Sequence, residues 1–457
     1  MAQPNILFIL GDDLGIGDLG SGEHPHAYAE TPNINQLMAS GTTFARAYAN
    51  SYICIPSRIS YMTGRYPFRY QTGNDVAYIN DHGFSAHEPL VTRLLHRNGS
   101  RTFHAGKWHI GPQSTLDSGE YGFDQANVSS FVNRSFGLEF CHEDLESRQH
   151  GKDHYVLENA LAMLDSVVAT PGSPFYLQVW SRLGHAPVCP PISLAERYDD
   201  VDIDVNLLSP EVQDKFQQCA DLGYDPEVGL KRYLVEIYSL DLEVGQLVAK
   251  IAQLGLEENT IVIFSSDHGP APVRELQNPQ DNAAARSGRC DMMGSPGPFS
   301  GGKHDLSEGG LRVPLVVKWP GRIRAGHVNR DTTFAFVDFL PTLAALADVP
   351  ADEVPTDIDG VDMSAVWLGT ADVRFRNGSY LCWRKGNRKW AAMLENWKIF
   401  VKIKLNTGTR QMTLYNVDMD PSEEVNLFGT AGDEHPMQEA AVAALEACET
   451  IPVGAAR

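Results

Sequence analysis

The sequence predicts an α/β fold: a large, mixed but mostly parallel sheet flanked by helices, and a smaller C-terminal α+β subdomain that contains an antiparallel sheet. Two patterns carry this prediction. Short apolar runs alternate with longer segments of helical spacing, and such runs are typical of strands buried on both faces of a parallel sheet. The composition changes near residues 369–376, beyond which short alternating strands lead to a final helix. We therefore expect a large domain over residues 1–371 and a subdomain over residues 372–457.

Each strand of the large sheet is predicted by an apolar run, and each flanking helix by its end signals. Thr31-Pro32 and Gly41, for example, are the expected start and stop of one helix. The predicted strands cover residues 5–10, 101–105, 175–180, 260–264 and 313–319. The predicted helices cover residues 31–41, 88–97, 155–169, 229–254 and 332–347.

The remaining segments are predicted as loops or as parts of the C-terminal subdomain. Residues 112–150 have weak periodicity, and residues 188–228 are polar and expected to cap a cleft. Residues 270–302 form a long loop rich in Gly, Pro and Asn, which is typical of a functional lid. In the subdomain, strands are predicted over residues 379–383, 389–394, 397–404 and 412–417, and a helix over 436–449.

Composition excludes several classes of protein. The chain of 457 residues is 43% hydrophobic and 21% charged, as is ordinary for a globular protein. It contains no apolar run near the roughly 20 residues of a membrane span. A net charge of −21 argues against nucleic acid as a partner, so any anion site must be a local cluster of Lys, Arg, His or metal. The N-terminus lacks a leader, so we expect a cytoplasmic protein or, if a leader was trimmed, a periplasmic or secreted one.

The cysteines give no pattern of their own. They show no CxxC or metal-binding spacing. With Cys54 set aside, six remain that are able to pair or to stay reduced, and the sequence favours neither. The seven positions are 54, 141, 189, 219, 290, 382 and 448.

The stretch from Cys54 to Arg65 is the most informative in the chain. Pro56 marks the first position of a helix of roughly two turns and Gly64 follows its last, which places Cys54 at the N-terminal end. Free N–H groups and the positive end of the helix dipole favour an anionic substrate and an anionic nucleophile there. The alternative is a buried cysteine that packs as a small apolar residue.

Polar residues follow four of the predicted strands. Asp12 and Asp13 follow the first strand, and paired carboxylates suit a hard divalent cation, although Gly-Asp-Asp is also ordinary turn chemistry. Ligands of open α/β sheets bind at the carboxyl edge of the strands, so we expect these residues to form one site. In chain order they are Asp12 and Asp13, Lys107 and His109, His185, and Asp267 and His268.

The motif Cys-x-Pro-Ser-Arg from position 54, followed by Met-Thr-Gly-Arg from position 62, resembles the signature of the type I sulfatases of the alkaline phosphatase superfamily. In that family a separate maturation enzyme oxidises the cysteine to Cα-formylglycine. The resemblance extends over nearly the whole chain and includes Glu308-Gly309-Gly310. It implies an alkaline-phosphatase-like fold, a catalytic domain over residues 1–371 and the activity of a sulfuric ester hydrolase.

The resemblance also implies roles for individual residues. The implied metal is Ca²⁺, with Mg²⁺ less favoured, and its ligands are Asp12, Asp13, Asp267, His268 and the formylglycine formed from Cys54. The implied catalytic residues are Cys54 itself, Arg58, which holds the formylglycine hydrate, Lys107 and Lys303, which grip sulfate oxygens, and His109 and His185. By this analogy His185, assisted by Lys303, protonates the departing alcohol, and His109 takes the proton that lets sulfate leave.

The substrate is less well defined by the sequence. A sulfated carbohydrate is expected over a small aryl sulfate, and six aromatic or basic residues are candidates for a sugar pocket. One alternative is a phosphonate monoester hydrolase or phosphodiesterase of the same superfamily, against which Asp13 argues mildly. The other is an unmatured, non-catalytic protein that binds an anion. The six candidate pocket residues are Trp180, Arg182, Trp383, Arg384, Lys385 and Arg388.

Overall fold

The computed structural model describes residues 3–70, 83–85, 87–111, 119–128, 149–167, 172–273, 290–376, 379–404, 406–429 and 437–452. Within these ranges no helix has the length and apolar character needed to cross a bilayer. Several features of the sequence analysis lie outside them, namely the chain start at Met1, most of the 112–150 segment, Cys141 and residues 274–289 of the expected lid.

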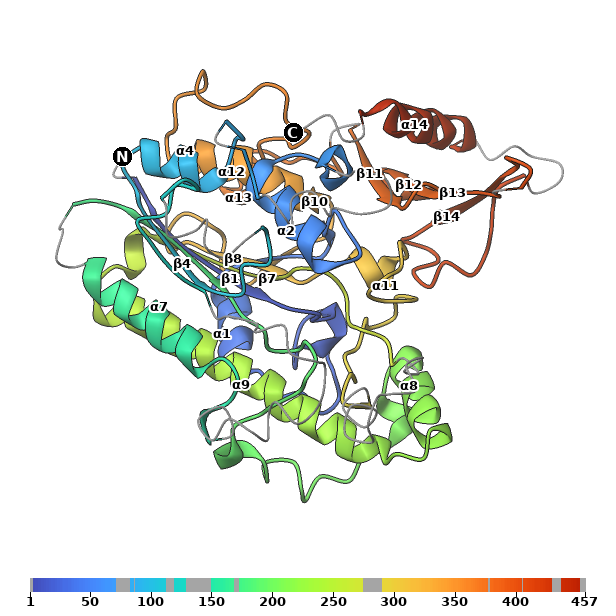
Figure 1. Cartoon of the computed structure of the whole chain (residues 1–457), viewed down its shortest axis with the longest axis horizontal. Coiled ribbons are helices and arrows are strands. Elements are labelled where there is room, and N and C mark those ends of the chain that lie inside the picture. Colours follow the sequence, from blue (N-terminus) through green and yellow to red (C-terminus); the bar gives the residue numbers. More distant parts are fainter. Residues whose placement is uncertain are drawn as a thin grey trace.

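The central sheet has eight strands and is mixed, as predicted (Figure 1). The five strands from β5 to β7 run parallel, whereas β8 is antiparallel to both β7 and β2. In spatial order the strands are β5 (Gln125–Val128), β4 (Arg101–Gly106), β6 (Phe175–Trp180), β1 (Asn5–Gly11), β7 (Thr260–Ser266), β8 (Leu315–Lys318), β2 (Thr42–Phe44) and β9 (His327–Asn329).

Helices cover both faces of this sheet because its central strands are apolar on both sides. In β1, Ile6 and Phe8 belong to one hydrophobic cluster and Leu7 and Ile9 to the other. On the first face lie α2 (Cys54–Thr63), α4 (Val91–Arg97), α12 (Phe339–Leu346) and α13 (Ser364–Trp367). On the second lie α1 (Pro32–Ser40), α7 (His154–Val167) and the long α9 (Pro226–Gln253).

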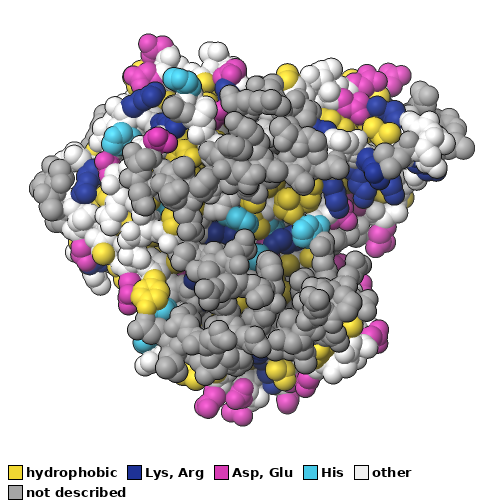
Figure 2. All heavy atoms as spheres, in the orientation of Figure 1, with side chains coloured by type: hydrophobic (Ala, Val, Ile, Leu, Met, Phe, Trp, Pro, Cys, Tyr) yellow, Lys and Arg dark blue, Asp and Glu magenta, His cyan; other side chains and the backbone are white. Residues whose placement is uncertain are grey.

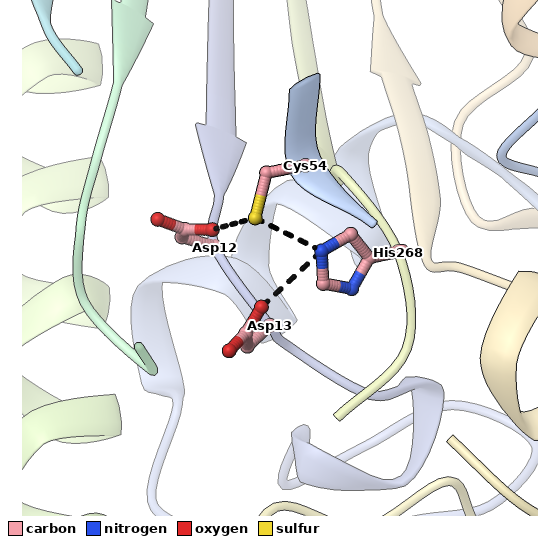
Figure 3. A group of neighbouring side chains, drawn as sticks. All are labelled: Asp12, Asp13, Cys54 and His268. Carbon is pink, nitrogen blue, oxygen red and sulfur yellow. Dashed lines mark hydrogen bonds and ion pairs between the residues drawn. The ribbon is translucent and has the colours of Figure 1, made fainter. Parts of the chain in front are cut away.

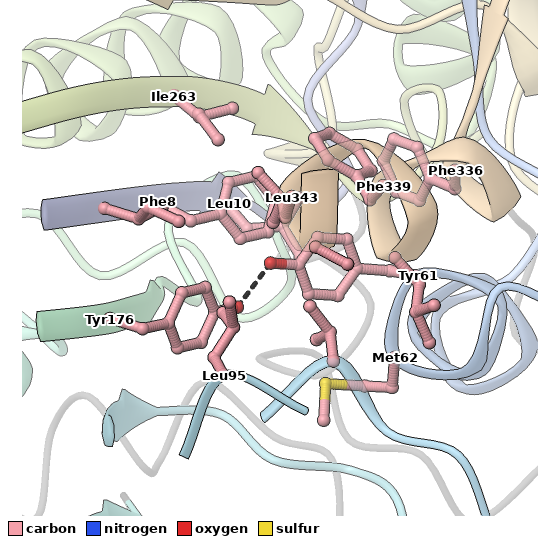
Figure 4. Packing of buried hydrophobic residues seen from close by; sticks show 14 of the residues in the cluster. Phe8, Leu10, Tyr61, Met62, Leu95, Tyr176, Ile263, Phe336, Phe339 and Leu343 are labelled. Carbon is pink, nitrogen blue, oxygen red and sulfur yellow. Dashed lines mark hydrogen bonds between the residues drawn. The ribbon is translucent and has the colours of Figure 1, made fainter. Parts of the chain in front are cut away.

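Tyr61 fixes α2 on the sheet (Figure 4). Its ring stacks on Phe8 at 4.6 Å and meets Phe339 edge-on at 4.9 Å between centroids. Its hydroxyl hydrogen-bonds that of Tyr176 on β6, so the polar atom is satisfied although it is buried. These contacts fix the later part of α2 against the sheet, and Cys54 is the first residue of the same helix.

The C-terminal subdomain is the predicted antiparallel sheet with one helix. Its strands follow one another in the order β11 (Tyr380–Lys385), β12 (Lys389–Leu394), β13 (Trp397–Ile403) and β14 (Arg410–Asn416). The helix α14 (Gln438–Thr450) packs on the sheet, and a disulfide joins Cys448 to Cys382 on β11. The division of the chain after residue 371 stays a prediction.

Two predicted segments differ from the observed structure. The helix predicted over 332–347 begins only at Phe339, because β10 (Phe334–Ala335) pairs with β3 (Ala47–Tyr48) first. The polar segment 188–228 contains a helix, α8 (Pro210–Asp221), which the sequence analysis missed although Val212, Phe216 and Cys219 recur at helical spacing. A second disulfide joins Cys219 on α8 to Cys290. The other short elements are α11 (Glu308–Leu311) and the 3-10 turns at 16–18, 67–70, 192–194, 205–207, 257–259 and 336–338.

Candidate active site

Four neighbouring strands deliver the predicted site residues to one edge of the sheet. β4, β6, β1 and β7 lie side by side and parallel, so their carboxyl ends meet. Asp13 and His109, at the ends of β1 and β4, have left-handed backbones with φ of 62° and 59°. Non-glycine residues seldom adopt this conformation, and when they do they are often at functional sites.

Cys54 is the first residue of α2, with Ile53 as the N-cap, and it is 5% exposed. The predicted start was wrong by two residues, because Pro56 occupies the third helical position. The end is as predicted, since Gly64 takes a left-handed conformation (φ 67°) and donates its N–H to Ser60 O. The Ser57 hydroxyl donates to the carbonyl of Asp267, which ties the first turn of α2 to the end of β7.

Four buried side chains surround one point beside Cys54 (Figure 3). His268 Nε2 lies 3.2 Å from Cys54 Sγ and 3.3 Å from Asp13 Oδ1. Asp12 Oδ1 lies 3.5 Å from the same sulfur. All four donor atoms are within 4.8 Å of one another.

Asp267 lies at the border of this group and connects it to Arg58. Its Oδ1 accepts the backbone N–H of Asp13 at 3.2 Å and is 3.6 Å from His268 Nε2. Its Oδ2 accepts both Nε and Nη2 of Arg58, at 3.2 and 3.0 Å. Asp267 therefore has one oxygen directed to the other predicted ligands and one held by the guanidinium.

Arg58 is fully buried, and its charge is balanced on several sides. Besides Asp267, it approaches Asp12 Oδ1 at 3.6 Å and donates to the carbonyl of Lys107 at 3.1 Å. The guanidinium also lies over the Trp180 ring at 4.9 Å. Arg58 is thus locked in place beside Cys54.

Two lysines bind the paired carboxylates. Lys107 Nζ donates to Asp12 Oδ2 at 2.5 Å. Lys303 Nζ donates to both oxygens of Asp13, at 2.6 and 2.7 Å, and is 3.7 Å from Cys54 Sγ. The sequence predicted both lysines for this site, and the structure brings both into it.

The charges of the site shift its pKa values in opposite directions. Burial alone would raise the pKa of Asp13, but Lys303 and the two neighbouring histidines lower it to about 2. The pKa of Asp12 is likewise lowered, chiefly by Lys107, against the effect of burial. Burial would lower the pKa of His268, yet Asp267, Cys54 and Asp13 raise it to about 9. Near neutral pH the carboxylates of Asp12 and Asp13 are therefore ionised and His268 is protonated, each held in its charged form by neighbours of opposite sign.

The two other predicted histidines lie at the mouth of the site. His185 Nε2 is 3.9 Å from Asp13 Oδ2, and its Nδ1 hydrogen-bonds the carbonyl of Ala186 at 2.6 Å. Because a carbonyl only accepts, Nδ1 carries the hydrogen and Nε2 faces the site. Burial and the charge of Lys303 lower the pKa of His185 to about 3. His109 is exposed, and partial enclosure with the charges of Lys107 and Arg58 lowers its pKa.

Lys152 and Glu236 hold the His185 loop, and the sequence analysis missed both. Lys152 Nζ donates to the carbonyls of His185 and Pro187 and to Glu236 Oε2 at 2.5, 3.0 and 2.9 Å. Glu236 also accepts the backbone N–H of Gly184 at 2.9 Å. The sequence did hold one sign of this network: Glu236 lies on the apolar face of the helix predicted over 229–254, where a carboxylate needs a buried partner.

The six residues considered for a sugar pocket do not form one. Trp180 and Trp383 are fully buried and belong to the cores. The Trp383 indole donates to the carbonyl of Ala49, and Arg182 is bound to Asp153 at 2.8 Å. Arg384, Lys385 and Arg388 lie at the end of β11 and the turn that follows it. Of these three, Lys385 reaches the edge of the site, because it donates to the carbonyl of His304.

The donor set fits a divalent metal ion. Carboxylate oxygens of Asp12 and Asp13 converge with a nitrogen of His268 at a buried point. His268 Nδ1 donates to the carbonyl of Gly269 at 2.9 Å, so Nε2 is the ring nitrogen that faces this point, where a metal ion would take the place of its proton. Figure 2 shows that the entrance is a hollow between the two halves of the molecule in which Lys or Arg and His side chains gather.

Comparison with known proteins identifies the family of the chain. A family profile described as Sulfatase matches residues 4–349, and one described as N-sulphoglucosamine sulphohydrolase, C-terminal, matches residues 302–448. The chain is 30% identical to arylsulfatase A of Homo sapiens over 382 residues, which is 80% of this chain and 68% of that protein.

Solved structures share the fold. The crystal structure of Ps i-CgsB in complex with k-i-k-neocarrahexaose is similar with a TM-score of 0.72 at 21% identity, covering 99% of this chain and 94% of that one. The phosphonate monoester hydrolase of Agrobacterium radiobacter has a TM-score of 0.67 at 17% identity, covering 98% and 95%. The family profile covers most of the chain, and its matched region contains every residue of the site described above. The chain belongs to the sulfatase family.

Proposed function

We propose that the protein hydrolyses a sulfate ester of a carbohydrate, with a formylglycine derived from Cys54 as nucleophile and Ca²⁺ as the metal. One observation carries this proposal: Cys54 lies at the N-terminus of α2, between the Asp12, Asp13 and His268 donors, with Lys303 Nζ 3.7 Å from its sulfur. A lone buried cysteine that packs as an apolar residue would not need this surrounding of charge.

The modified residue would supply an aldehyde hydrate with two hydroxyls on one carbon, and the metal would lower the pKa of the nearer hydroxyl. The metal would be held by Asp12, Asp13, Asp267 and His268, of which Asp267 contributes the oxygen that Arg58 leaves open. Arg58 would hold the hydrate in one orientation, because its own position is fixed by Asp267 and Trp180.

The lysines would stabilise negative charge on the sulfate group, and the histidines would transfer the two protons that the reaction requires. Lys107 and Lys303 bind the two carboxylates beside residue 54, where they would meet the sulfate oxygens as negative charge builds on them. His185 Nε2 faces the same space and would deliver a proton to the leaving alcohol, since the charge of a bound sulfate ester opposes the effect of Lys303 on its pKa. His109, at the exposed mouth, would accept the proton that accompanies sulfate release.

A carbohydrate substrate is supported by the C-terminal match to an N-sulphoglucosamine sulphohydrolase profile and by the fold shared with a protein crystallised with a neocarrahexaose. The proposal also requires a formylglycine-generating enzyme as partner, because no residue of the site supplies an oxidant for Cys54.

A phosphonate monoester hydrolase is the second candidate, since such an enzyme shares the fold. The paired Asp12 and Asp13 weigh against it, each being bound by its own lysine. An unmatured protein that only binds an anion is the third, and the state of residue 54 separates it from the first two.

Two measurements test the proposal. Mass spectrometry of the tryptic peptide from Ala47 to Arg58 is expected to show a formylglycine in place of the Cys54 thiol in protein from its native host. The converted protein is then expected to turn over p-nitrophenyl sulfate faster than p-nitrophenyl phenylphosphonate. An intact thiol in every copy, or a preference for the phosphonate, would contradict the proposal.

A further inference from the structure

The C-terminal sheet carries a positive surface on a strongly acidic protein. Residues 380–404 contain seven Lys or Arg residues and a single acidic residue, Glu395, although the whole chain has a net charge of −21. Figure 2 shows Lys and Arg side chains gathered on this part of the molecule, next to the hollow that leads to the site. A local positive field of this kind attracts anions even on a negative protein.

Three of these lysines form a row. In the strand register Lys385 on β11 lies opposite Lys389 on β12, and Lys389 lies opposite Lys402 on β13. Residues directly opposite on neighbouring strands share a face, so the three side chains stand side by side at about the 4.8 Å spacing of strands. We call this set, Lys385, Lys389 and Lys402, the lysine row.

Two lysines of the row, Lys389 and Lys402, are not neutralised by a carboxylate of the described residues. Like charges directly opposite each other destabilise a sheet. Within the part of the chain that the structure describes, neither Lys389 nor Lys402 forms an ion pair with a carboxylate, and Lys402 is exposed. By contrast Lys398, on the same strand as Lys402 and the same face, is buried and bound to Glu308 at 2.9 Å. The positive charges of Lys389 and Lys402 are therefore available to an anionic partner.

The inner end of the lysine row contacts the segment that carries Lys303. Lys385 Nζ donates to the carbonyl of His304 and lies 5.4 Å from the centre of the Tyr52 ring. His304 directly follows Lys303, and its N–H donates to the carbonyl of Tyr52 at 2.9 Å, two residues before Cys54. The row thus starts beside the residues that surround position 54 and leads outward across the sheet.

We propose that the lysine row binds a second anionic group, a sulfate or a carboxylate, of a multiply charged saccharide whose reacting sulfate lies at residue 54. This inference rests on the proposed function and narrows its substrate class to polyanionic oligosaccharides. The ammonium groups of the row are point charges on flexible side chains. They suit anionic groups whose spacing varies from one saccharide to another, which a single rigid pocket would not accommodate.

Binding of a heparin-derived tetrasaccharide, measured by calorimetry, tests this without requiring turnover. The double variant Lys389→Ser/Lys402→Ser is expected to raise its Kd at least tenfold and to weaken its salt dependence. The matched control is Arg322→Ser/Arg324→Ser, which removes two exposed positive charges beyond the end of β8, at the opposite edge of the sheet from the site. The control is expected to leave the Kd within twofold of the wild type.

Activity gives a second readout that separates the two proposals. Inhibition of p-nitrophenyl sulfate hydrolysis by the tetrasaccharide is expected to weaken at least tenfold in the Lys389→Ser/Lys402→Ser variant, with a much smaller effect on p-nitrophenyl sulfate itself. Equal tetrasaccharide affinity in wild type and variant would overturn the lysine-row inference alone. Converted protein that binds the tetrasaccharide through the row but hydrolyses no sulfate ester would overturn the proposed function alone.

Discussion

Lys303 binds both carboxylate oxygens of Asp13, at 2.6 and 2.7 Å, and also lies 3.7 Å from the sulfur of Cys54. The two partners belong to elements far apart in the chain, the end of β1 and the start of α2. Lys303 itself follows the 270–302 loop, and its N–H donates to the carbonyl of Pro270 at 2.8 Å. One ammonium group therefore joins three segments at the position of the nucleophile.

Replacing Lys303 is expected to lower the rate of catalysis because it removes a positive charge beside residue 54. Lys303→Ala is expected to lower kcat for p-nitrophenyl sulfate by roughly 100- to 1000-fold, the usual effect of removing one preorganised group that stabilises developing charge. The control Lys318→Ala removes a lysine that pairs with Glu257, away from the site, and is expected to keep full activity. A Lys303→Ala variant with wild-type kcat would remove this residue from the mechanism.

Arg58 is expected to be needed for stability as well as activity. Arg58→Ala would leave the buried carboxylate of Asp267 without its guanidinium partner, and breaking a buried pair in this way costs about 3–5 kcal/mol. The surface pair Arg197–Glu30 is the control, since Arg197→Ala is expected to cost less than about 1 kcal/mol. Urea unfolding measures both. Equal losses in the two variants would mean that burial of the Arg58 charge has no special cost.

Calcium is expected to stabilise the protein through the Asp12, Asp13 and His268 donors. At a Ca²⁺ concentration 100 times its Kd, the free energy of unfolding should rise by about 2.7 kcal/mol, because the ion binds only the folded state. Thermal unfolding in chelator, then with added Ca²⁺ or Mg²⁺, measures this, and Ca²⁺ should raise the Tm more. Asp13→Asn should abolish most of the shift. A shift that survives this substitution would place the ion elsewhere.

The central sheet and the site residues at its edge were predictable because they depend on local patterns. Apolar runs mark strands buried on both faces, and polar residues directly after those strands must lie at one edge once the strands are parallel. Asp12, Lys107, His185 and Asp267 were found in this way. The four C-terminal strands were equally predictable, since short runs rich in apolar and aromatic residues are separated by turn residues.

The parts that the sequence did not reveal depend on contacts between distant segments. Lys152 and Glu236 meet only because α9 crosses behind the His185 loop, and nothing near either residue indicates the other. Trp383 is an aromatic residue beside a basic stretch, which resembles a sugar pocket, but the strand register turns it into the core. The same register places Lys385, Lys389 and Lys402 in a row, although their spacing in sequence suggests no such pattern.

The disulfide between Cys382 and Cys448 is expected to stabilise the C-terminal subdomain. It closes a segment with a sequence separation of 66 residues and joins β11 to α14, so its loss should cost roughly 2–4 kcal/mol. Thermal unfolding of Cys382→Ser/Cys448→Ser measures the loss, and a reducing agent should then affect this variant less than the wild type. The other described bridge, Cys219–Cys290, serves as the comparison, since it joins segments of the large domain. An unchanged Tm would show that packing of α14 alone holds the subdomain.

His26 is expected to make the protein less stable in mild acid. It is 9% exposed, and burial lowers its pKa to about 4, from 6.5 in the unfolded chain. Because the folded pKa is the lower one, the unfolded chain takes up a proton first as the pH falls. Stability is therefore fully present above pH 6.5 and declines toward pH 4, by up to about 3 kcal/mol. His104, whose pKa burial lowers to about 3, contributes with the same sign.

The free energy of unfolding, measured between pH 7 and pH 5, should fall less in His26→Leu than in the wild type. His87→Leu, at an exposed position, should leave the wild-type pH dependence in place. If the two variants have the same pH dependence, the His26 ring must be protonated as easily in the folded protein as in the unfolded chain.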